Sequence, residues 1–345
     1  MHDFRTSLPD QLGRIDLSGK SVLVTGGTGS FGQHFVRRLL ERDRPQRLVI
    51  FSRDELKQSE MAEALRPLDR GTLRFFIGDV RDRDRLQMAM RGVDIVVHAA
   101  AMKQVPTAEY NPFECIRTNV MGAENVVNAA LAANVERVLA LSTDKAVNPA
   151  NLYGASKLAS DKIFVAANNL SGDRGTRFAV VRYGNVIGSR GSVLPLFRRL
   201  LAEGAGALPV THEGMTRFWI TLRQGVDFVL SCLPLARGGE IFVPKIPSMR
   251  IVDLARALAP AARIDIVGIR PGEKLHEVMI TEDDARSTVE YRDRYVIEPS
   301  LAFWDKETHR SLGAQPVREG FRYSSETNDQ WLDGPAFLRL VGDGA

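Results

Sequence analysis

Short apolar runs alternate with longer amphipathic segments throughout the first half of the chain. The runs lie at residues 21–25, 47–51, 73–77, 94–98, 138–141 and 176–182. Continuous apolar runs of this length are typical of strands buried on both faces, and the segments between them are long enough for helices. The pattern predicts an α/β fold built on a Rossmann-type, doubly wound parallel sheet.

The pattern changes after Tyr183. A glycine-rich connection covers 184–192, a second break covers 209–214, and shorter strands are predicted at 217–221, 240–244 and 265–269. Residues 270–274 are expected to lead into a helix. We therefore expect a loose arm over 1–20, a Rossmann domain over 21–185, and a smaller C-terminal domain over 186–345, some of whose elements return to the Rossmann core.

Composition excludes several classes of protein. The chain has 345 residues and is 44% hydrophobic, enough for a sizeable core. Cys115 and Cys232 are far apart, which argues against a disulfide framework or a metal site. No apolar run approaches a membrane span, and residues 1–20 lack an apolar signal core, so a cytoplasmic enzyme without membrane contact is expected. The net charge is +4 with dispersed basic residues, and 81–85 alternates in sign like a solvated helix start, so no nucleic-acid partner is expected.

A glycine loop follows the first predicted strand and precedes a helix predicted over 33–42. Its glycines allow a tight turn and let the backbone approach a pyrophosphate. Two registers of the dinucleotide fingerprint fit, one starting at Gly26 and one at Gly27. The candidate cofactor-binding residues in the loop are Gly26, Thr28, Gly29, Ser30, Phe31 and Gly32.

The end of the second strand bears on which cofactor is bound. Ser52 and Arg53 follow it, with Asp54 and then Lys57 close behind. Arg53 and Lys57 could hold a 2′-phosphate, which favours NADP. The alternative is that Asp54 binds the ribose of NAD while Arg53 stacks on the adenine.

Later strand ends add further candidate contacts to the cofactor. Asp79 could bond the adenine amine, and the small side chains after the fourth strand let the chain pass close to the dinucleotide. A helix starting at Asn111, with Pro112 at its first position and Glu114 at its third, is predicted to run to about residue 133. His98 is interpreted as a structural residue. The added cofactor candidates are Ser52, Asp79, Val80, Ala99, Ala100, Ala101 and Thr118.

The most informative segment is 142–157. Tyr153 and Lys157 are four residues apart, so they share one helix face, and a nearby ammonium favours the phenolate. Asp144 and Lys145 add an acid and a base. The Tyr-x-x-x-Lys spacing is common by chance, but downstream of a phosphate-binding loop it indicates a catalytic pair.

These motifs together resemble a known family. They are TGGTGSFG (25–32), SRDELKQ (52–58), STDKA (142–146), YGASK (153–157), RYGNV (182–186) and RPGEK (270–274). The chain resembles the extended short-chain dehydrogenases/reductases and, more narrowly, the inverting UDP-N-acetylglucosamine 4,6-dehydratases of the pseudaminic acid pathway. The Asp144-Lys145 pair is the feature that points to the inverting dehydratases in particular. Epimerases of this superfamily usually carry small or hydroxyl residues at these positions, and retaining dehydratases carry Asp-Glu.

The resemblance implies a mechanism. Tyr153, aided by Lys157, would deprotonate the C4 hydroxyl while hydride passes to NADP, and Thr143 would hydrogen-bond that hydroxyl. Lys145 would remove the C5 proton and Asp144 would protonate the departing C6 hydroxyl. Hydride return to C6 and reprotonation of C5 from the opposite face would give UDP-2-acetamido-2,6-dideoxy-beta-L-arabino-hex-4-ulose.

The candidate substrate-binding residues are Lys103, Asn185, Arg217, Arg270 and Glu273. Arg217 and Arg270 could clamp a diphosphate with bidentate hydrogen bonds; the alternative for each is a surface salt bridge. The expected partners are a UDP-sugar and further copies of the chain.

Two alternatives remain open at this level. One is a UDP-sugar 4-epimerase or a retaining dehydratase, which Lys145 disfavours. The other is a non-catalytic NADP-sensing protein, although such proteins often lack the Tyr or Lys of the pair.

The assigned roles demand a neutral Lys145 and a protonated Asp144, whereas adjacent opposite charges favour the ionised forms. A bend near Thr143 is required for both side chains to reach the same sugar.

Overall fold

A single large sheet organises the protein. The computed structural model describes residues 15–172, 175–189, 191–301, 304–305 and 307–343. Within these residues the core of the sheet is seven parallel strands, in the spatial order β3 (Leu73–Ile77), β2 (Arg47–Ser52), β1 (Ser21–Thr25), β4 (Ile95–His98), β5 (Arg137–Thr143), β6 (Arg177–Tyr183) and β10 (Ile241–Pro244). The first six have the 3-2-1-4-5-6 order of a dinucleotide-binding fold.

Most of the parallel strands are buried on both faces, as the continuous apolar runs predicted, whereas the edge strand β3 is partly exposed. Every residue of β1 and β4 is buried, and β6 is buried from its second residue onward. Burial on both faces requires helices on both sides of the sheet. The predicted α/β, doubly wound parallel sheet is confirmed, and each of the six strands predicted in the first half starts and ends within three residues of its expected position.

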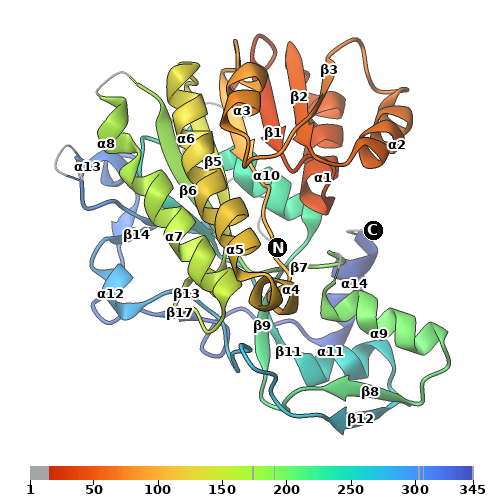
Figure 1. Cartoon of the computed structure of the whole chain (residues 1–345). Helices are drawn as coiled ribbons and strands as arrows, with labels where there is room; N and C mark the ends of the chain where they lie inside the picture. The colour runs from red at the N-terminus through yellow and green to blue at the C-terminus, as the bar shows by residue number, and fades with distance from the viewer. Residues whose placement is uncertain (1–14, 173–174, 190, 302–303, 306, 344–345) are drawn as a thin grey trace.

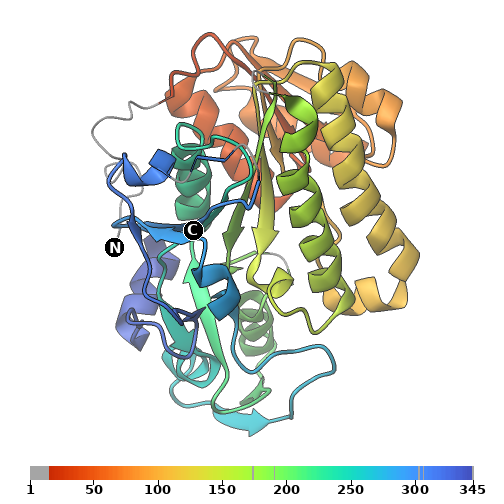
Figure 2. The ribbon, with the colours of Figure 1, turned by 90° about the vertical axis from the view of Figure 1, so that its left-hand side faces the viewer.

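Helices cover the two faces of this sheet (Figures 1 and 2). On one face lie α3 (Arg83–Ala89), α6 (Gly122–Ala132) and α7 (Leu152–Ala166), and on the other lie α1 (Ser30–Arg38) and α10 (Leu222–Cys232). The remaining helical elements of the first half are η1 (Leu39–Asp43), α2 (Glu55–Leu65), α4 (Val105–Tyr110), α5 (Pro112–Ile116), η2 (Arg117–Met121), η3 (Asp144–Ala146) and α8 (Asn168–Ser171).

Part of the second half extends the main sheet. Beyond β10 the sheet continues with antiparallel strands β15 (Arg294–Ile297), β14 (Thr288–Glu290) and β16 (Gln315–Pro316). These segments bury residues such as Val289 and Val296 in the main core. The C-terminal half is therefore shared between the Rossmann core and a second layer of structure, and a boundary at residue 185 stays a prediction.

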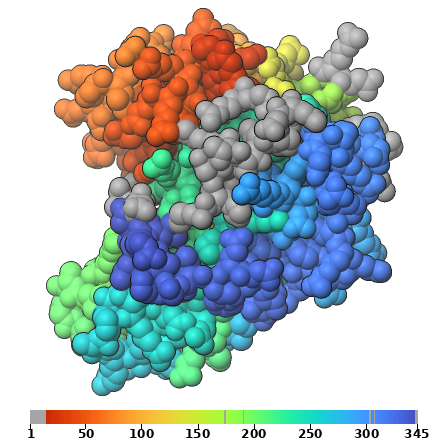
Figure 3. Space-filling view, turned by 180° about the vertical axis from the view of Figure 1, so that it is seen from behind, coloured from red at the N-terminus to blue at the C-terminus, as the bar shows by residue number. Residues whose placement is uncertain are grey.

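The second layer has its own apolar core, which includes Phe197, Trp219 and Phe337. It lies below the parallel strands in the view of Figure 1, and its green, teal and blue elements are seen from behind in Figure 3. Its elements are β7 (Asn185–Val186), α9 (Val193–Ala202), β8 (Ala207–Val210), β9 (Thr216–Ile220), β11 (Ser248–Arg250), α11 (Ile251–Leu258), β12 (Arg263–Ile266) and α14 (Gly334–Asp343). The strands pair as β11–β9–β7 and β12–β8.

Three local predictions differ from the structure. The segment after Lys274 does not form a helix: it enters strand β13 (Val278–Ile280), which pairs with β17 (Tyr323–Ser324), and the short helices α12 (Glu282–Ala285) and α13 (Glu307–Arg310) come later. Asn111 precedes α5, but its side chain donates to the carbonyl of Thr107 instead of capping the helix. The predicted helix over 33–42 starts earlier, at Ser30, and its last turn is the π-type segment η1.

The segment before β1 is in part packed on the core. Leu17 is buried in the main apolar cluster, and the ammonium of Lys20 lies 2.5 Å from a carboxylate oxygen of Glu136. Residues 1–14 of the predicted arm lie outside the described residues. Among the helices that the structure describes, none is long and apolar enough to cross a membrane.

Candidate active site

The catalytic candidates gather where β5 ends. Thr143 is the last residue of β5, and the chain then turns at once into the 3-10 helix η3. The Thr143 side chain accepts a hydrogen bond from the backbone N–H of Lys145 at 3.3 Å, which fixes this turn. The bend predicted near Thr143 is therefore present, and it places the side chains of Asp144 and Lys145 together instead of on opposite sides of a strand.

Two glycines let other segments approach this turn. A Cβ on Gly154, in the first turn of α7, would overlap the carbonyl oxygen of Lys145. A Cβ on Gly184 would lie 3.3 Å from Oδ2 of Asp144 and 2.6 Å from Cβ of Phe218. The helix that carries Tyr153 and the connection after β6 thus pack directly against η3.

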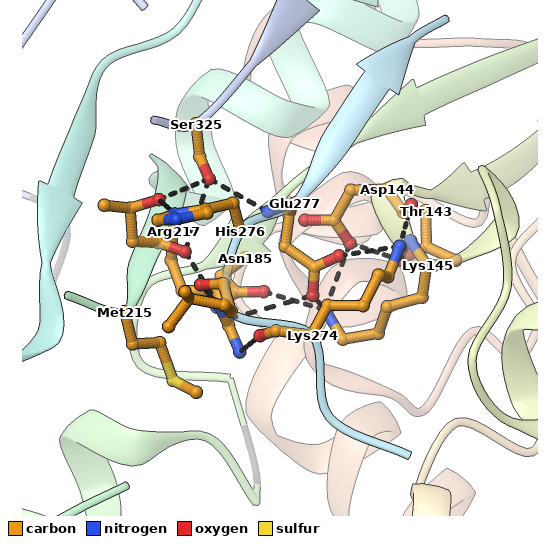
Figure 4. Close-up of polar contacts among 12 residues, drawn as sticks. Thr143, Asp144, Lys145, Asn185, Met215, Arg217, Lys274, His276, Glu277 and Ser325 are labelled. Carbon is orange, nitrogen blue, oxygen red and sulfur yellow. Dashed lines mark hydrogen bonds and ion pairs between the residues drawn. The ribbon is translucent and has the colours of Figure 1, made fainter. Parts of the chain in front are cut away.

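Lys145 is surrounded by oxygen atoms (Figure 4). Its Nζ lies 3.0 Å from Oδ1 of Asp144 and 3.2 Å from Oδ1 of Asn185, and it forms an ion pair with Oε1 of Glu277 at 3.1 Å. An ammonium has three N–H donors, so these three oxygens match its capacity. The surroundings favour the charged form of Lys145.

Glu277 in turn is surrounded by cations. Besides Lys145, its carboxylate lies 3.8 Å from Nε of Arg217 and 3.1 Å from Nζ of Lys274. The carboxylate is buried, with 2% of its side-chain surface exposed. Lys274 also donates to the carbonyl oxygen of Val147 at 2.8 Å, which ties the segment before β13 to the chain just after η3.

The two carboxylates of this cluster differ in their electrostatics. Burial raises the pKa of Asp144, against the opposing charge of Lys145, and Oδ2 of Asp144 has no hydrogen-bond partner within the described residues. Burial also disfavours the charged form of Glu277, but Lys145, Arg217 and Lys274 outweigh it and lower the pKa of Glu277 to about 2. Burial by itself would lower the pKa of Lys145, yet the charges of Asp144 and Glu277 raise it.

Tyr153 lies beside this cluster. Burial raises the pKa of Tyr153 to about 12, opposed first by the charge of Lys145 and then by a hydrogen bond with Thr143. The strongest opposing cation is therefore Lys145, whereas the sequence pattern pointed to Lys157. Burial lowers the pKa of Lys157, against the charge of Asp161, and the residue is 3% exposed.

The glycine loop has the geometry that a dinucleotide needs. Gly26 has φ +66°, and a Cβ there would lie 2.9 Å from the backbone of Ala100. A Cβ on Gly32 would lie 2.5 Å from the backbone of Gly27, so helix and loop pack as closely as glycines allow. Gly29, at the N-cap of α1, provides no side-chain cap, so the first N–H groups of the helix stay available to an anion. These residues fit a bound pyrophosphate.

The residues predicted to select the cofactor lie at the ends of β2 and β3. Nη1 of Arg53 is 3.5 Å from Oδ2 of Asp79, and 61% of the Arg53 side chain is exposed. Lys57 pairs with Asp54 at 2.6 Å. Ser52 is buried, and its hydroxyl accepts a hydrogen bond from Gln58.

Asn119 and Thr25 hold the chain around the cofactor candidates Ala99, Ala100 and Ala101, because the backbone N–H groups of Ala99 and Ala100 donate to the Thr25 hydroxyl. The amide of Asn119 exchanges hydrogen bonds with the backbone of Met102 and donates to the hydroxyl of Ser156, which joins the chain after Ala101 to α7. The neighbouring Thr118 is buried in the π-type segment η2, and its hydroxyl has no hydrogen-bond partner in the described part of the chain. His98 is buried and bonded to Thr25 at 2.8 Å, and burial lowers the pKa of its ring to about 3, as expected of a structural residue.

The substrate-binding candidates are in different surroundings. Asn185 contacts Lys145, and Arg217 is buried and donates to the carbonyl oxygens of Thr216, Lys274 and Leu275, so Arg217 is not a surface salt bridge. Lys103 and Arg270 lie in exposed loops, and the carboxylate of Glu273 accepts from the backbone N–H of Arg270 at 3.3 Å.

Comparison with known proteins gives the family. The model of the family described as "Polysaccharide biosynthesis protein" matches residues 22–299. The chain belongs to this family. A relative named UDP-N-acetylglucosamine 4,6-dehydratase (inverting), from Campylobacter jejuni, is 56% identical over 327 residues, which cover 93% of this chain and 97% of that protein. A relative from Rickettsia canadensis named UDP-glucose 4-epimerase is 44% identical over 285 residues, covering 81% of this chain and 82% of that protein.

Solved structures share the fold of this chain. The structure of Pen from Bacillus thuringiensis has a TM-score of 0.86 and 34% sequence identity, covering 95% of this chain and all of that one. A dTDP-glucose 4,6-dehydratase from Streptomyces venezuelae, solved with NAD, has a TM-score of 0.67 and 24% identity, covering 93% of this chain and 96% of that one. The resemblance to inverting dehydratases that the motifs predicted is confirmed.

Sequence reasoning missed two members of the charged cluster in this polysaccharide biosynthesis family protein, Glu277 and Lys274. Lys274 ends the RPGEK motif, but only the arginine and glutamate of that motif were candidates. Glu277 directly precedes the buried run Val278–Ile280, and a carboxylate beside a buried strand was the available signal.

Proposed function

We propose that this protein is a UDP-N-acetylglucosamine 4,6-dehydratase that inverts C5. Its product would be UDP-2-acetamido-2,6-dideoxy-beta-L-arabino-hex-4-ulose, a precursor for pseudaminic acid or another surface glycan. The observation that carries the proposal is the contact between Lys145 and Asp144 beside Tyr153, which puts a base and an acid next to the residue that would start the reaction. The 56% identity to a relative named for this activity supports it.

A nicotinamide dinucleotide is the cofactor in this proposal, and the glycine loop, Thr118 and the chain at 99–101 would hold it. When bound, it accepts hydride from C4 of the sugar and returns it to C6. We propose NADP because Arg53 lies exposed at the end of β2, where a 2′-phosphate would reach it. Asp79 lies 3.5 Å from the guanidinium of Arg53, but its carboxylate pairs more closely with Arg81 at 2.7 Å, so Arg53 would be able to turn toward the phosphate.

Each catalytic side chain has a separate task. Tyr153 would take the proton of the C4 hydroxyl. Burial raises its pKa to about 12 even though Lys145 and a hydrogen bond with Thr143 oppose the rise, so the positive ring of the bound cofactor would have to favour the phenolate further. The ketone at C4 then acidifies the C5 proton, which Lys145 would remove. Asp144 would protonate the departing C6 hydroxyl, and its raised pKa suits a general acid.

The second layer of structure would bind the UDP-sugar over the ends of the parallel strands. Asn185 already contacts Lys145, so it would lie closest to the reacting sugar carbons. Lys103, Arg217, Arg270 and Glu273 would contribute more distant contacts. A homo-oligomer is the expected assembly.

The runner-up function is a UDP-sugar 4-epimerase, which the name of the Rickettsia relative suggests. An epimerase leaves C5 and C6 untouched, so it would have no use for an acid and a base at Asp144 and Lys145. A mass spectrum after incubation with UDP-N-acetylglucosamine separates the two functions. Loss of one water is expected, and a product of unchanged mass would favour the epimerase.

The stereochemistry provides a sharper test. In deuterium oxide the product should carry deuterium at C5 and have the L-arabino configuration, because C5 is rebuilt from the opposite face. A substrate deuterated at C4 should deliver its label to the C6 methyl. Nuclear magnetic resonance must be read early, since a 4-keto sugar epimerises slowly at C5 on its own. A D-xylo product at the first time points would refute inversion and leave dehydration intact.

A further inference from the structure

The unexplained member of the cluster is Glu277, which reaches the site from a segment far along the chain. Its backbone is fixed by two hydrogen bonds with Ser325: Glu277 N–H donates to the serine hydroxyl at 2.9 Å, and Ser325 N–H donates to the Glu277 carbonyl at 2.8 Å. Its carboxylate then points at Lys145 (Figure 4). A buried carboxylate held this firmly against a proposed catalytic base requires a functional explanation.

We propose that Glu277 is a positioning residue, which fixes the amine of Lys145 between two carboxylates and stays ionised, so that the proton released by Lys145 passes to Asp144. This inference rests on the proposed dehydratase function. It assigns different tasks to two carboxylates that touch the same ammonium group.

The cations around the two carboxylates decide which one takes the proton. Glu277 faces Lys145, Arg217 and Lys274, whereas Asp144 has an ion pair with Lys145 and a hydrogen bond from the Thr143 hydroxyl at 3.0 Å. An ionised Glu277 is therefore stabilised far more than an ionised Asp144. The opposite directions of their pKa shifts agree with this order.

The proton transfer from Lys145 to Asp144 conserves the total charge and the number of protons of the pair. An N–H bond of the Lys145 ammonium breaks and an O–H bond forms on Asp144, which converts the ion pair into a neutral amine and a neutral carboxylic acid. The amine then takes the C5 proton, and the acid gives its proton to the departing C6 oxygen, which leaves as water. At the end both residues are charged again and Glu277 is unchanged. The transfer yields the neutral amine and the neutral acid that the assigned roles require, and it runs against the charges of Asp144 and Glu277, which favour the ammonium form of Lys145.

The groups that face the Asp144–Lys145 pair come from several elements. Tyr153 lies on α7, Asn185 on β7, Arg217 on β9, and Lys274 and Glu277 in the segment before β13. His276 shares this segment, but it pairs with Glu326 at 3.1 Å and bonds Thr216, away from Lys145. Among these groups, Glu277 is the anion closest to Lys145 after Asp144.

The test compares Glu277→Gln with Glu277→Asp in the full-length protein. Glu277→Gln removes the charge and keeps the shape. We expect C4 oxidation, seen as the absorbance of reduced nicotinamide in a single turnover, to stay close to wild type, while elimination slows by at least about tenfold. The KM for the UDP-sugar should change little. Removing an anion lowers the pKa of neighbouring groups, so the alkaline limb of the kcat–pH profile should move to lower pH by about one unit.

Two further variants make the sign of the effect decisive. Glu277→Asp keeps the negative charge, so the alkaline limb of its kcat–pH profile should stay at the wild-type position even if kcat falls. Lys274→Met removes a cation, so the alkaline limb of its kcat–pH profile should move to higher pH. This variant still tests the inference if Glu277→Gln does not fold. Glu326→Gln is the matched control, because Glu326 lies one residue after Ser325 and contacts His276 and Arg322 but not Lys145.

The outcomes separate this inference from the proposed function. No loss of water from the substrate with wild-type protein would overturn the dehydratase proposal itself. Wild-type dehydration together with an unshifted alkaline limb in Glu277→Gln and Lys274→Met would overturn the role of Glu277 alone. Equal impairment of Glu277→Gln and Glu277→Asp with no shift of the limb would also overturn it, because it would indicate a purely structural residue.

Discussion

Gly154 packs directly against the carbonyl oxygen of Lys145. A Cβ at this position would overlap that oxygen and would lie 3.0 Å from the carbonyl carbon and 3.1 Å from Cβ of Pro149. The glycine therefore sets the distance between the first turn of α7 and η3. Through that distance it sets how Tyr153 lies relative to Asp144 and Lys145.

Gly154→Ala should consequently damage both stability and catalysis. We expect a loss of about 1–3 kcal/mol in the free energy of unfolding, the usual cost of overpacking, and a large fall in kcat, because η3 must shift to admit the methyl group. Urea unfolding and steady-state kinetics measure the two effects. Gly225→Ala is the matched control: Gly225 is also helical and buried, but nothing lies within 4 Å of its Cβ position. That variant should be neutral or slightly stabilised.

Cofactor preference should depend on Arg53. Wild-type protein stripped of cofactor should bind NADP more tightly than NAD, and Arg53→Ala should narrow the difference by ~1–3 kcal/mol, the scale of a charge-assisted hydrogen bond. Isothermal titration calorimetry measures the affinities for NADP and NAD of the wild type and the variant. Arg66, an exposed arginine just after α2, provides a control that should leave the preference unchanged. Equal affinity of the wild type for NAD and NADP would contradict the prediction.

The two half-reactions should separate in single-turnover experiments. Tyr153→Phe should prevent C4 oxidation, so no reduced cofactor forms, with a loss of about 10²–10⁴ in rate. Lys145→Ala should permit oxidation and block elimination, so reduced cofactor or a 4-keto intermediate accumulates. Lys162→Ala, an exposed lysine on α7, is the control and should behave as wild type. Dehydration by Lys145→Ala at the wild-type rate would disprove the role given to Lys145.

Glu277 should also make stability depend on pH in the acid range. Its folded-state pKa lies at about 2, below the ordinary 4.5, so its ionised form stabilises the fold above pH 4.5 and that contribution is lost as the pH falls toward 2. The difference in unfolding free energy between wild type and Glu277→Gln should be largest near neutral pH, up to about 3 kcal/mol, and should shrink on acidification. Urea unfolding across this range measures it, with Glu326→Gln as the control. A difference that grows in acid would have the wrong sign.

The sequence by itself determined the features that depend on neighbours along the chain. Apolar runs identified the parallel strands, because a strand buried on both faces needs an apolar side chain at nearly every position. The glycines at 26, 29 and 32 indicated the phosphate loop, and backbone conformation or close approach excludes a Cβ at Gly26 and Gly32. Tyr153 and Lys157 were found through helical spacing, and the bend after Thr143 followed from the need to bring two adjacent side chains to one side.

The tertiary structure alone decided what reaches Lys145 from elsewhere. Glu277 contacts Lys145 although more than a hundred residues separate them in the sequence. The contact forms because Val278–Ile280 is buried as a strand paired with Tyr323–Ser324, and this pairing places the carboxylate of Glu277 against η3. The same segment was predicted to be a helix, since periodicity does not separate strand from helix in so short an apolar run. Arg217 was a candidate diphosphate clamp with a surface salt bridge as the alternative, and the structure buries it beside Glu277. Contacts of this kind depend on how distant segments bury their apolar surface together, and no local pattern in the sequence specifies that choice.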